Sequence, residues 1–252
     1  MHISGAEDPQ QGAAPPSTHL APPPTATQET SPISVRYVGC AHSNTVLASL
    51  NDLRVHRELC DVELVVDGAR IPAHKAILCT CSPYFKAMFS SSYSESNQDS
   101  VVIREVSSSA LELLVQYFYT SEVYITTDNV QELLSASCMF QIATLREACC
   151  EFMRRHLGIT NCLGVRAIAD LHSCAQLRKV ADDFAKKNFA SVIESEEFLK
   201  LNIGHLVELF SADDLGAPSE EKVYEAAMTW VHHDPINREK YLVQLLEKVS
   251  FS

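Results

Sequence analysis

The residues whose side chains are best suited to catalysis or metal binding lie in one short stretch, residues 66–89, which reads VDGARIPAHKAILCTCSPYFKAMF. His74 could act as a general base toward a thiol nucleophile at Cys79 or Cys81. Alternatively, the Cys-x-Cys pair could contribute ligands to a metal site. A third reading is that these polar residues hold a folded scaffold together and do no chemistry.

Cysteine catalysis requires a thiolate, and therefore a nearby base or positive charge that lowers the thiol pKa. Cys79 and Cys81 are two residues apart on a helix predicted to begin near Lys75, so they point to different helix faces. Neither lies within a dense positive cluster. The chain also contains no phosphate-binding glycine loop, nucleophile elbow, dinucleotide fingerprint or zinc-protease motif. We expect that the protein is not an enzyme.

A structural zinc site needs two spaced pairs of ligands, and the cysteine and histidine pairs of this chain do not combine in that way. The remaining pairs without partners at useful spacing are Cys149-Cys150, His172 with Cys174, and His232-His233. We expect no metal and no cofactor. A redox-sensing cysteine remains open, but the sequence does not select one of the nine thiols.

Composition narrows the class of protein further. The 252 residues allow one or two domains, 46% of them are hydrophobic, and the net charge is −12. Because phosphate neutralisation needs a basic face, this charge argues against sequence-independent nucleic-acid binding. There is no apolar run of about 18 residues and no signal-peptide pattern. We expect reduced thiols and a cytoplasmic location, with a cytoskeletal or nuclear one left open.

The chain divides into three regions that differ in composition and in the spacing of apolar residues. Residues 1–42 hold seven of the eleven prolines, and this segment has too little apolar surface to offset its ordering entropy, so a disordered tail is predicted. Its Pro22–Pro24 run could dock in a groove that recognises extended proline helices, although a plain tail is the simpler reading. Residues 43–157 predict an α+β module, and residues 158–252 predict an all-helical one.

Within the α+β module, apolar spacing predicts a helix over residues 43–57, and alternation predicts a strand over 60–66. Asp67-Gly68 is a hairpin signal that returns the chain through a second strand at 69–73. A helix from Lys75 breaks at Ser82-Pro83, and a short helix then runs through Phe89. The later predicted elements are a strand at 101–103 and helices from a Ser109-x-x-Glu112 capping box to Thr120, at 128–140, and at 145–157 from a Thr144-x-x-Glu147 box.

The all-helical module is read from helical spacing interrupted by short Ser, Gly, Asp and Pro breaks. Its predicted helices are residues 159–172, 176–192, 202–211, 219–233 and 237–249. Strands are predicted only before Gly158.

The scaffold reading explains the opening stretch best. Apolar residues between Ala76 and Phe89 supply a core, and His74 is expected to satisfy a backbone group. Asp61 and Lys75 could meet as a partly buried polar pair near the base of the hairpin, which would specify packing without adding much stability.

Several motifs in this order resemble the BTB (POZ) domain followed by the BACK domain of the Kelch-like family. The BTB-like motifs are Leu53-Arg-x-x-x-Glu-Leu-Cys-Asp-Val-x-Leu64, Ala73-His-Lys-Ala-Ile-Leu78 and Cys81-Ser-x-Tyr-Phe-x-Ala-Met-Phe89, with a leucine-rich segment ending at Thr120. The BACK-like motifs are residues 161–170, Ser195-Glu-Glu-Phe198 and Glu221-x-Val-Tyr-x-Ala-x-x-x-Trp230. This resemblance covers nearly everything from residue 43 onward.

The resemblance implies a homodimer, because BTB domains of this family pair through their first helix. The corresponding face here holds Val46, Leu47, Leu50 and Leu53. An apolar stripe so early in the chain has little of its own chain to cover it, so a second copy is a natural cover. Packing of this face back onto its own sheet remains the alternative.

The resemblance also implies binding to cullin-3, through a hydrophobic-x-Glu motif that corresponds to Tyr93-Ser94-Glu95. An apolar side chain would enter a pocket on the partner, and a carboxylate would meet donors at a partner helix end. Tyr119 and Phe140 are further candidates for this face, although either could belong to the core. The helical pair around 159–174 would extend the cullin surface, and its polar residues are expected to be solvated.

In this family, BACK is usually followed by Kelch repeats that bind substrate. No Kelch periodicity is present, and the chain stops where the family continues, so we expect an incomplete BACK domain in a fragment, a truncated gene model or an isoform. Such a form would dimerise with itself or with related BTB proteins, and it could interfere with full-length relatives through mixed dimers.

Two functions of different kinds remain open. The first is a substrate-specific adaptor of a cullin-3 ubiquitin ligase, which positions substrate without catalysis of its own. The alternative is an actin-associated or other structural assembly protein that uses the BTB domain only to dimerise. A BTB transcription regulator is disfavoured, because a BACK-like region takes the place of zinc fingers and the chain is acidic.

Overall fold

The computed structural model describes residue 39 and residues 41–90, 98–212, 215–217 and 219–249. The residues from Ala41 onward belong to one compact unit, Ala41–Ser252. The predicted tail, residues 1–42, lies almost entirely outside the described residues, so its disorder stays a prediction. None of the helices in the described part of the chain is both long and apolar enough to cross a lipid bilayer.

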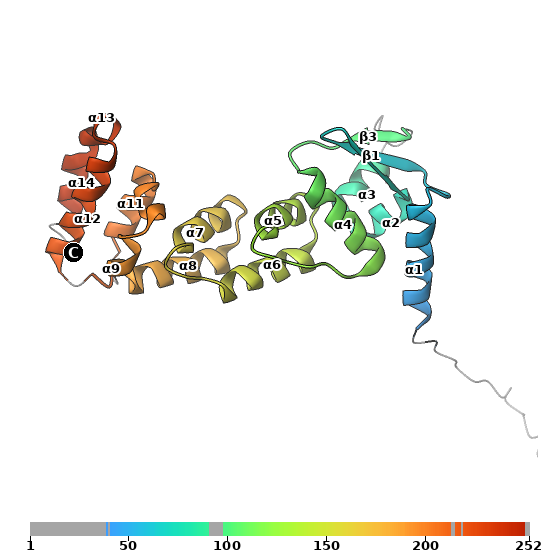
Figure 1. Ribbon diagram of the computed structural model, residues 1–252, viewed down its shortest axis with the longest axis horizontal. Helices are drawn as coiled ribbons and strands as arrows, with labels where there is room; N and C mark the ends of the chain where they lie inside the picture. The colour runs from blue at the N-terminus through green and yellow to red at the C-terminus, as the bar shows by residue number, and fades with distance from the viewer. Residues whose placement is uncertain (1–38, 40, 91–97, 213–214, 218, 250–252) are drawn as a thin grey trace, which may run out of the picture. The chain divides into compact units, whose positions relative to one another are not determined.

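A three-stranded sheet with the order β2-β1-β3 begins the α+β module (Figure 1). Strands β1 (Val62–Val66) and β2 (Ala69–Ala73) are antiparallel, and β3 (Ser100–Val102) runs parallel to β1. Alternate side chains of β1, at Val62, Leu64 and Val66, are buried, which is the period of two that the sequence predicts.

The hairpin between β1 and β2 turns at Asp67 and Gly68, whose φ angles are 46° and 83°. Two successive residues with positive φ are the requirement of a type I′ turn, and Asp-Gly meets it with little strain. The predicted hairpin is therefore confirmed.

Helices α1 to α6 complete the α+β module. As predicted, a helix break separates α2 from α3, because Pro83 cannot donate a backbone hydrogen bond and restricts the residue before it. The helices are α1 (His42–Val55), α2 (Lys75–Cys81), α3 (Pro83–Ser90), α4 (Ser108–Thr120), α5 (Val130–Met139) and α6 (Ala143–Arg155).

Both predicted capping boxes are wrong in detail. The N-cap of helix α4 lies two residues earlier than expected, and the hydroxyl of Ser107, not Ser109, accepts the hydrogen bond from the Ala110 amide at 3.3 Å. Helix α6 begins after Ile142 without a side-chain cap, so Thr144 lies inside the helix.

The second module is all-helical over its described residues, as predicted. The predicted helix at 176–192 divides into α8 and α9 at Asn188, and the short helix α10 was not predicted. The elements are α7 (Cys162–Leu171), α8 (Ala175–Lys187), α9 (Phe189–Val192), α10 (Glu196–Leu199), α11 (Ile203–Phe210), α12 (Glu220–His233), α13 (Pro235–Arg238), the 3-10 helix η2 (Glu239–Tyr241) and α14 (Leu242–Val249).

The hydrophobic core does not divide at the predicted boundary between the α+β module and the all-helical module. One core cluster holds the sheet and helices α4 to α6, and it also takes in Val165, Ala169, Leu177 and Ala181 of α7 and α8. A second cluster holds the later helices around Phe189, and it reaches the first residues of α7. The α7–α8 pair therefore contributes to both cores. The overall prediction of an α+β module followed by helices is confirmed.

Candidate functional site

Helix α1 presents the predicted dimer face. None of its 14 residues is buried in this chain. Val46 is 42% exposed, while Leu47, Leu50 and Leu53 are half-buried. Leu50 packs against the first core. The chain therefore covers this apolar stripe only in part, and pairing through it stays a prediction.

The segment after α1 extends this apolar surface. Leu59 is 80% exposed, and both Arg57 and Leu59 have left-handed backbones, with φ of 59° and 55°. The Glu58 amide donates to the Leu53 carbonyl at 2.7 Å, which holds the turn against α1. Left-handed conformations are disfavoured for residues with a side chain, and such strain concentrates at functional surfaces. Here it holds a leucine side chain in solvent beside α1.

His74 lies in a buried network and not beside the predicted thiols. Its Nε2 is 3.2 Å from the Glu58 carbonyl oxygen, which can only accept, so Nε2 carries the proton. Its Nδ1 then accepts from the Tyr119 hydroxyl at 2.9 Å. The same Tyr119 oxygen accepts from the His74 backbone amide at 2.9 Å. Every hydrogen-bonding atom of this imidazole is used, so His74 connects β2, α4 and the segment after α1.

The pKa values of the neighbouring thiols shift in the direction that opposes nucleophilic catalysis. Burial raises the pKa of Cys60, Cys79 and Cys81 above the usual value for a thiol. The sulfur within reach of His74 Nε2 belongs to Cys60, at 4.0 Å. A nucleophilic cysteine requires the opposite shift.

Tyr119 and Phe140, predicted as candidate cullin contacts, are placed in the core by the structure. Both side chains are 0% exposed. Burial raises the pKa of the Tyr119 hydroxyl to about 12, and the Arg54 guanidinium lies 5.1 Å from the centre of its ring. Phe140 stacks on Phe85 with centroids 4.9 Å apart. Side chains without exposed surface cannot meet a partner, so their placement on the cullin face is corrected.

The predicted Asp61–Lys75 pair has a different form. Asp61 Oδ1 accepts from the backbone amide of Lys75 at 2.7 Å, so it satisfies an unpaired donor at the start of α2. The Lys75 ammonium lies 5.5 Å from the centre of the Phe89 ring. The link between the two residues is therefore a helix cap made with the main chain, not the side-chain pair that was expected.

The predicted cullin motif, Tyr93-Ser94-Glu95, lies outside the described residues. It falls between the end of α3 at Ser90 and the start of β3 at Ser100. Its role stays a prediction.

Four cysteines that are scattered in the sequence influence one another across α5, α6 and α8. Burial is the largest cause that raises the pKa of Cys149 and Cys150 to about 12, and neighbouring thiols raise both further. Cys138 and Cys150 each interact with Cys174. Among the described residues, no three His, Cys, Asp or Glu side chains have an arrangement that could hold a metal ion.

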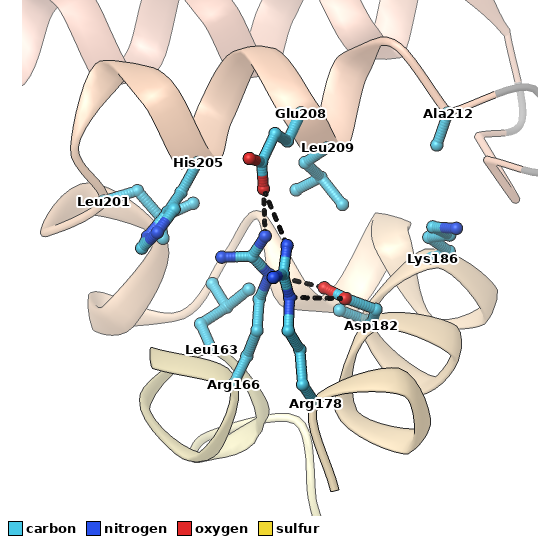
Figure 2. Close-up of a pocket in the computed structure, with 11 residues that line it drawn as sticks. Leu163, Arg166, Arg178, Asp182, Lys186, Leu201, His205, Glu208, Leu209 and Ala212 are labelled. Atoms are coloured by element: carbon cyan, nitrogen blue, oxygen red, sulfur yellow. Dashed lines mark hydrogen bonds and ion pairs between the residues drawn. The ribbon is translucent and has the colours of Figure 1, made fainter. Parts of the chain in front are cut away.

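A second polar network joins α7, α8 and α11, and sequence reasoning missed it. Arg166 is only 6% exposed, whereas the polar residues of this segment were expected to be solvated. Its guanidinium donates to Asp182 and to Glu208 (Figure 2). A usable signal was present, because Arg166 is three residues from both Leu163 and Ala169, which are buried on the apolar face of α7.

The start of α7 is capped from a distance. Glu197 Oε2 accepts from the backbone amides of Leu163 and Gly164 at 3.2 and 3.1 Å. A carboxylate is favoured there by the unpaired amides and the helix dipole. A Cβ at Gly164 would lie 2.5 Å from Glu197 Oε1, so any larger residue there would displace the Glu197 carboxylate from its present position.

Comparison with known proteins finds two families. The BTB/POZ domain model matches residues 50–157, and the model described as "BTB And C-terminal Kelch", abbreviated BACK, matches residues 162–252. Among solved structures, the BTB domain of zebrafish PATZ1 is 28% identical to this chain and covers 48% of this chain and 99% of its own, with a TM-score of 0.45. The two matched segments meet between α6 and α7.

Proposed function

The chain is a BTB–BACK protein, and from that premise we propose that it is a self-associating adaptor of a cullin-3 ubiquitin ligase. BTB and BACK domains are interaction modules, and the proposed role needs no bond-making chemistry from this chain. The protein would hold a substrate close to the ligase and so raise its effective concentration there.

The observation that supports this proposal most directly is the partly covered face of α1. A helix of 14 residues with no buried side chain gains little from its own chain. A twofold interface would bring the same face of two copies together, so that Val46, Leu47 and Leu50 of each copy meet their equivalents. The exposed Leu59 would enlarge the apolar area removed from water.

For the cullin contact, the proposal rests on the resemblance of Tyr93-Ser94-Glu95 to the family motif. Tyr93 would fill a pocket on cullin-3, and Glu95 would accept hydrogen bonds at a partner helix N-terminus. Since Tyr119 and Phe140 are buried, they would support this surface from behind and not contact the partner. The proposed location is the cytoplasm, and the substrate remains unassigned.

The test is a measurement of molar mass by light scattering, for the purified chain alone and with the cullin-3 N-terminal region. We expect twice the chain mass of 27.9 kDa. Leu47→Asp should give a monomer, because a charge would be buried in the dimer interface. The matched control is Val243→Asp, an exposed valine on α14, which should leave the dimer intact.

In the same experiment, Tyr93→Ala combined with Glu95→Lys should abolish cullin-3 binding and preserve the dimer mass. A wild-type chain that is monomeric would contradict self-association through α1. A wild-type dimer that ignores cullin-3 would favour the alternative, a structural or actin-associated assembly protein.

A further inference from the structure

A cavity of about 320 Å³ lies where α7, α8 and α11 meet. We call it the α7–α8–α11 cavity. Its size is at the lower end of the range for small-ligand pockets. It is lined by Leu163 and Arg166 of α7, by Arg178, Asp182, Ala185 and Lys186 of α8, and by Leu201, His205, Glu208, Leu209 and Ala212 of α11 and its flanking residues (Figure 2).

One donor in this cavity lacks a hydrogen-bond partner within the part of the chain that the structure describes. Arg166 Nε donates to Asp182, and Nη2 donates to Glu208. Nη1 is buried and has no hydrogen-bond partner among the described residues. In Figure 2 this third nitrogen lies on the side of Leu201 and His205, away from Arg178. A buried N–H without an acceptor is costly and uncommon in native structures.

The charges around this donor indicate what kind of acceptor it suits. Both carboxylates near Arg166 are also close to Arg178, whose Nε is 3.7 Å from Asp182 Oδ2 and whose Nη2 is 3.7 Å from Glu208 Oε2. Arg178 pairs in addition with Asp170 at 2.6 Å. The cavity wall itself carries three cations, including Lys186, and two carboxylates, and Asp170, which lies outside the wall, supplies the third carboxylate of this network. A ligand with a full negative charge gains nothing from this balance, whereas a neutral carbonyl suits one open N–H.

Apart from His205, the other residues on the cavity wall are aliphatic. Leu163, Leu201 and Leu209 line it together with two alanines. Leu163 and Leu201 are part of the second core, so these walls are held in place by packing. A branched aliphatic group would fill the space between the leucines and remove apolar surface from water.

We propose that the α7–α8–α11 cavity binds an uncharged carbonyl group that is carried next to a branched aliphatic group. The carbonyl oxygen accepts a hydrogen bond from Arg166 Nη1, and the aliphatic group contacts Leu163, Leu201 and Leu209. This chemistry is found in the peptide group of an aliphatic residue and in small organic amides.

The test is a methyl NMR titration of the full chain labelled at leucine and alanine methyl groups, with 4-methylpentanamide as the probe. Shifts should concentrate at Leu163, Leu201 and Leu209 and leave Leu64 of the sheet unchanged. For a ligand of this size we expect a Kd of roughly 1–10 mM. No saturable shift up to a tenfold excess over that range would overturn the proposal and leave the donor to solvent alone.

Two comparisons sharpen the test. His205→Trp puts a larger side chain on the cavity wall on the side of Nη1 and leaves the ion pairs of Arg166 in place (Figure 2). It should weaken probe binding at least tenfold, whereas Ala175→Trp, at an exposed position on α8, should not. The carboxylate 4-methylpentanoate has the same skeleton and should bind at least fivefold more weakly than the amide. An equal or tighter affinity for the carboxylate, or a His205→Trp variant that binds normally, would overturn the proposal.

The source of the carbonyl is decided by a blocked peptide with one internal leucine. Tighter binding than the amide would identify a polypeptide segment, and exclusion of the peptide with retention of the amide would identify a small molecule. Either result supports the shared chemistry. The titration is independent of the cullin proposal, because it reports on methyl groups that line the cavity and requires neither dimerisation nor cullin-3.

Discussion

Two buried polar side chains, His74 in the α+β module and Arg166 in the helical module, serve as a natural comparison. Both are less than 9% exposed, and each joins three segments of the chain. Every hydrogen-bonding atom of the His74 ring has a protein partner. Nη1 of Arg166, beside a cavity, has no such partner among the residues that the structure describes.

The difference teaches how a structural polar residue differs from one that is available to a ligand. A neutral histidine with two partners is complete, so its environment needs nothing further. An arginine has five N–H groups in a fixed fork, and two carboxylates can leave part of that fork unused. Burial alone therefore does not distinguish the two roles, and the count of satisfied atoms does.

The largest expected effect comes from removal of the Arg166 charge. Arg166→Met keeps much of the volume but leaves Asp182 and Glu208 without their closest partner, and should destabilise the chain by about 2–3 kcal/mol. Urea unfolding followed by circular dichroism measures this. Arg178→Met is the control, because Arg178 is 41% exposed, and should cost about 1 kcal/mol or less. Equal effects would contradict a special role for the buried guanidinium.

A smaller effect is expected when buried hydrogen-bonding atoms of His74 lose their partner, so that they are left unsatisfied as Nη1 of Arg166 is. Tyr119→Phe keeps the ring but removes the oxygen that serves both the His74 amide and Nδ1. Leaving these buried atoms unpaired should cost about 1–2 kcal/mol in the same urea experiment. Tyr117→Phe removes an exposed hydroxyl contact to Thr144 and should be close to neutral. If Tyr119→Phe were also neutral, the His74 network would not be the completed structural link described above.

The smallest effect is expected at a partly exposed carboxylate, which solvent can reach. Hydrogen bonds from Arg70 and Arg57 hold the pKa of Glu63 below its ordinary value of 4.5. This stabilisation is present above pH 4.5 and is lost as the pH falls through the lower folded-state pKa. Glu63→Gln should therefore flatten the dependence of stability on pH below about 4.5. The flattening should shrink in high salt, and a salt-independent change would point to another cause.

The sequence predicted the elements whose signals are local. Asp67-Gly68 favours a tight turn because both residues tolerate positive φ. Ser82-Pro83 ends a helix because proline lacks a backbone N–H and restricts the residue before it. The end of α4 was also placed correctly at Thr120. Its start was not, since Ser107 and Ser109 offer the same hydroxyl and only the backbone path after β3 decides between them.

The candidate site was harder to predict because burial depends on packing between distant segments. Tyr119 and Phe140 carry no local mark that separates a docking aromatic from a core one. Cys138 and Cys174 are 36 positions apart, and their thiols interact because α5 packs on α6 and α6 packs on α8. Arg166 was missed for a different reason. Its charge favoured a prediction that it is solvated, although its spacing from Leu163 and Ala169 places it on the apolar face of α7.

The sharing of one core by the α+β module and the α7–α8 pair has a practical consequence for anyone who dissects this protein. Val165, Ala169 and Leu177 pack with the residues around Leu145 and Cys149. A fragment that ends at the sequence boundary near residue 157 would lack these neighbours, and apolar side chains of α6 would become exposed to water. The boundary between the two modules in the sequence therefore differs from the boundary between the two hydrophobic cores.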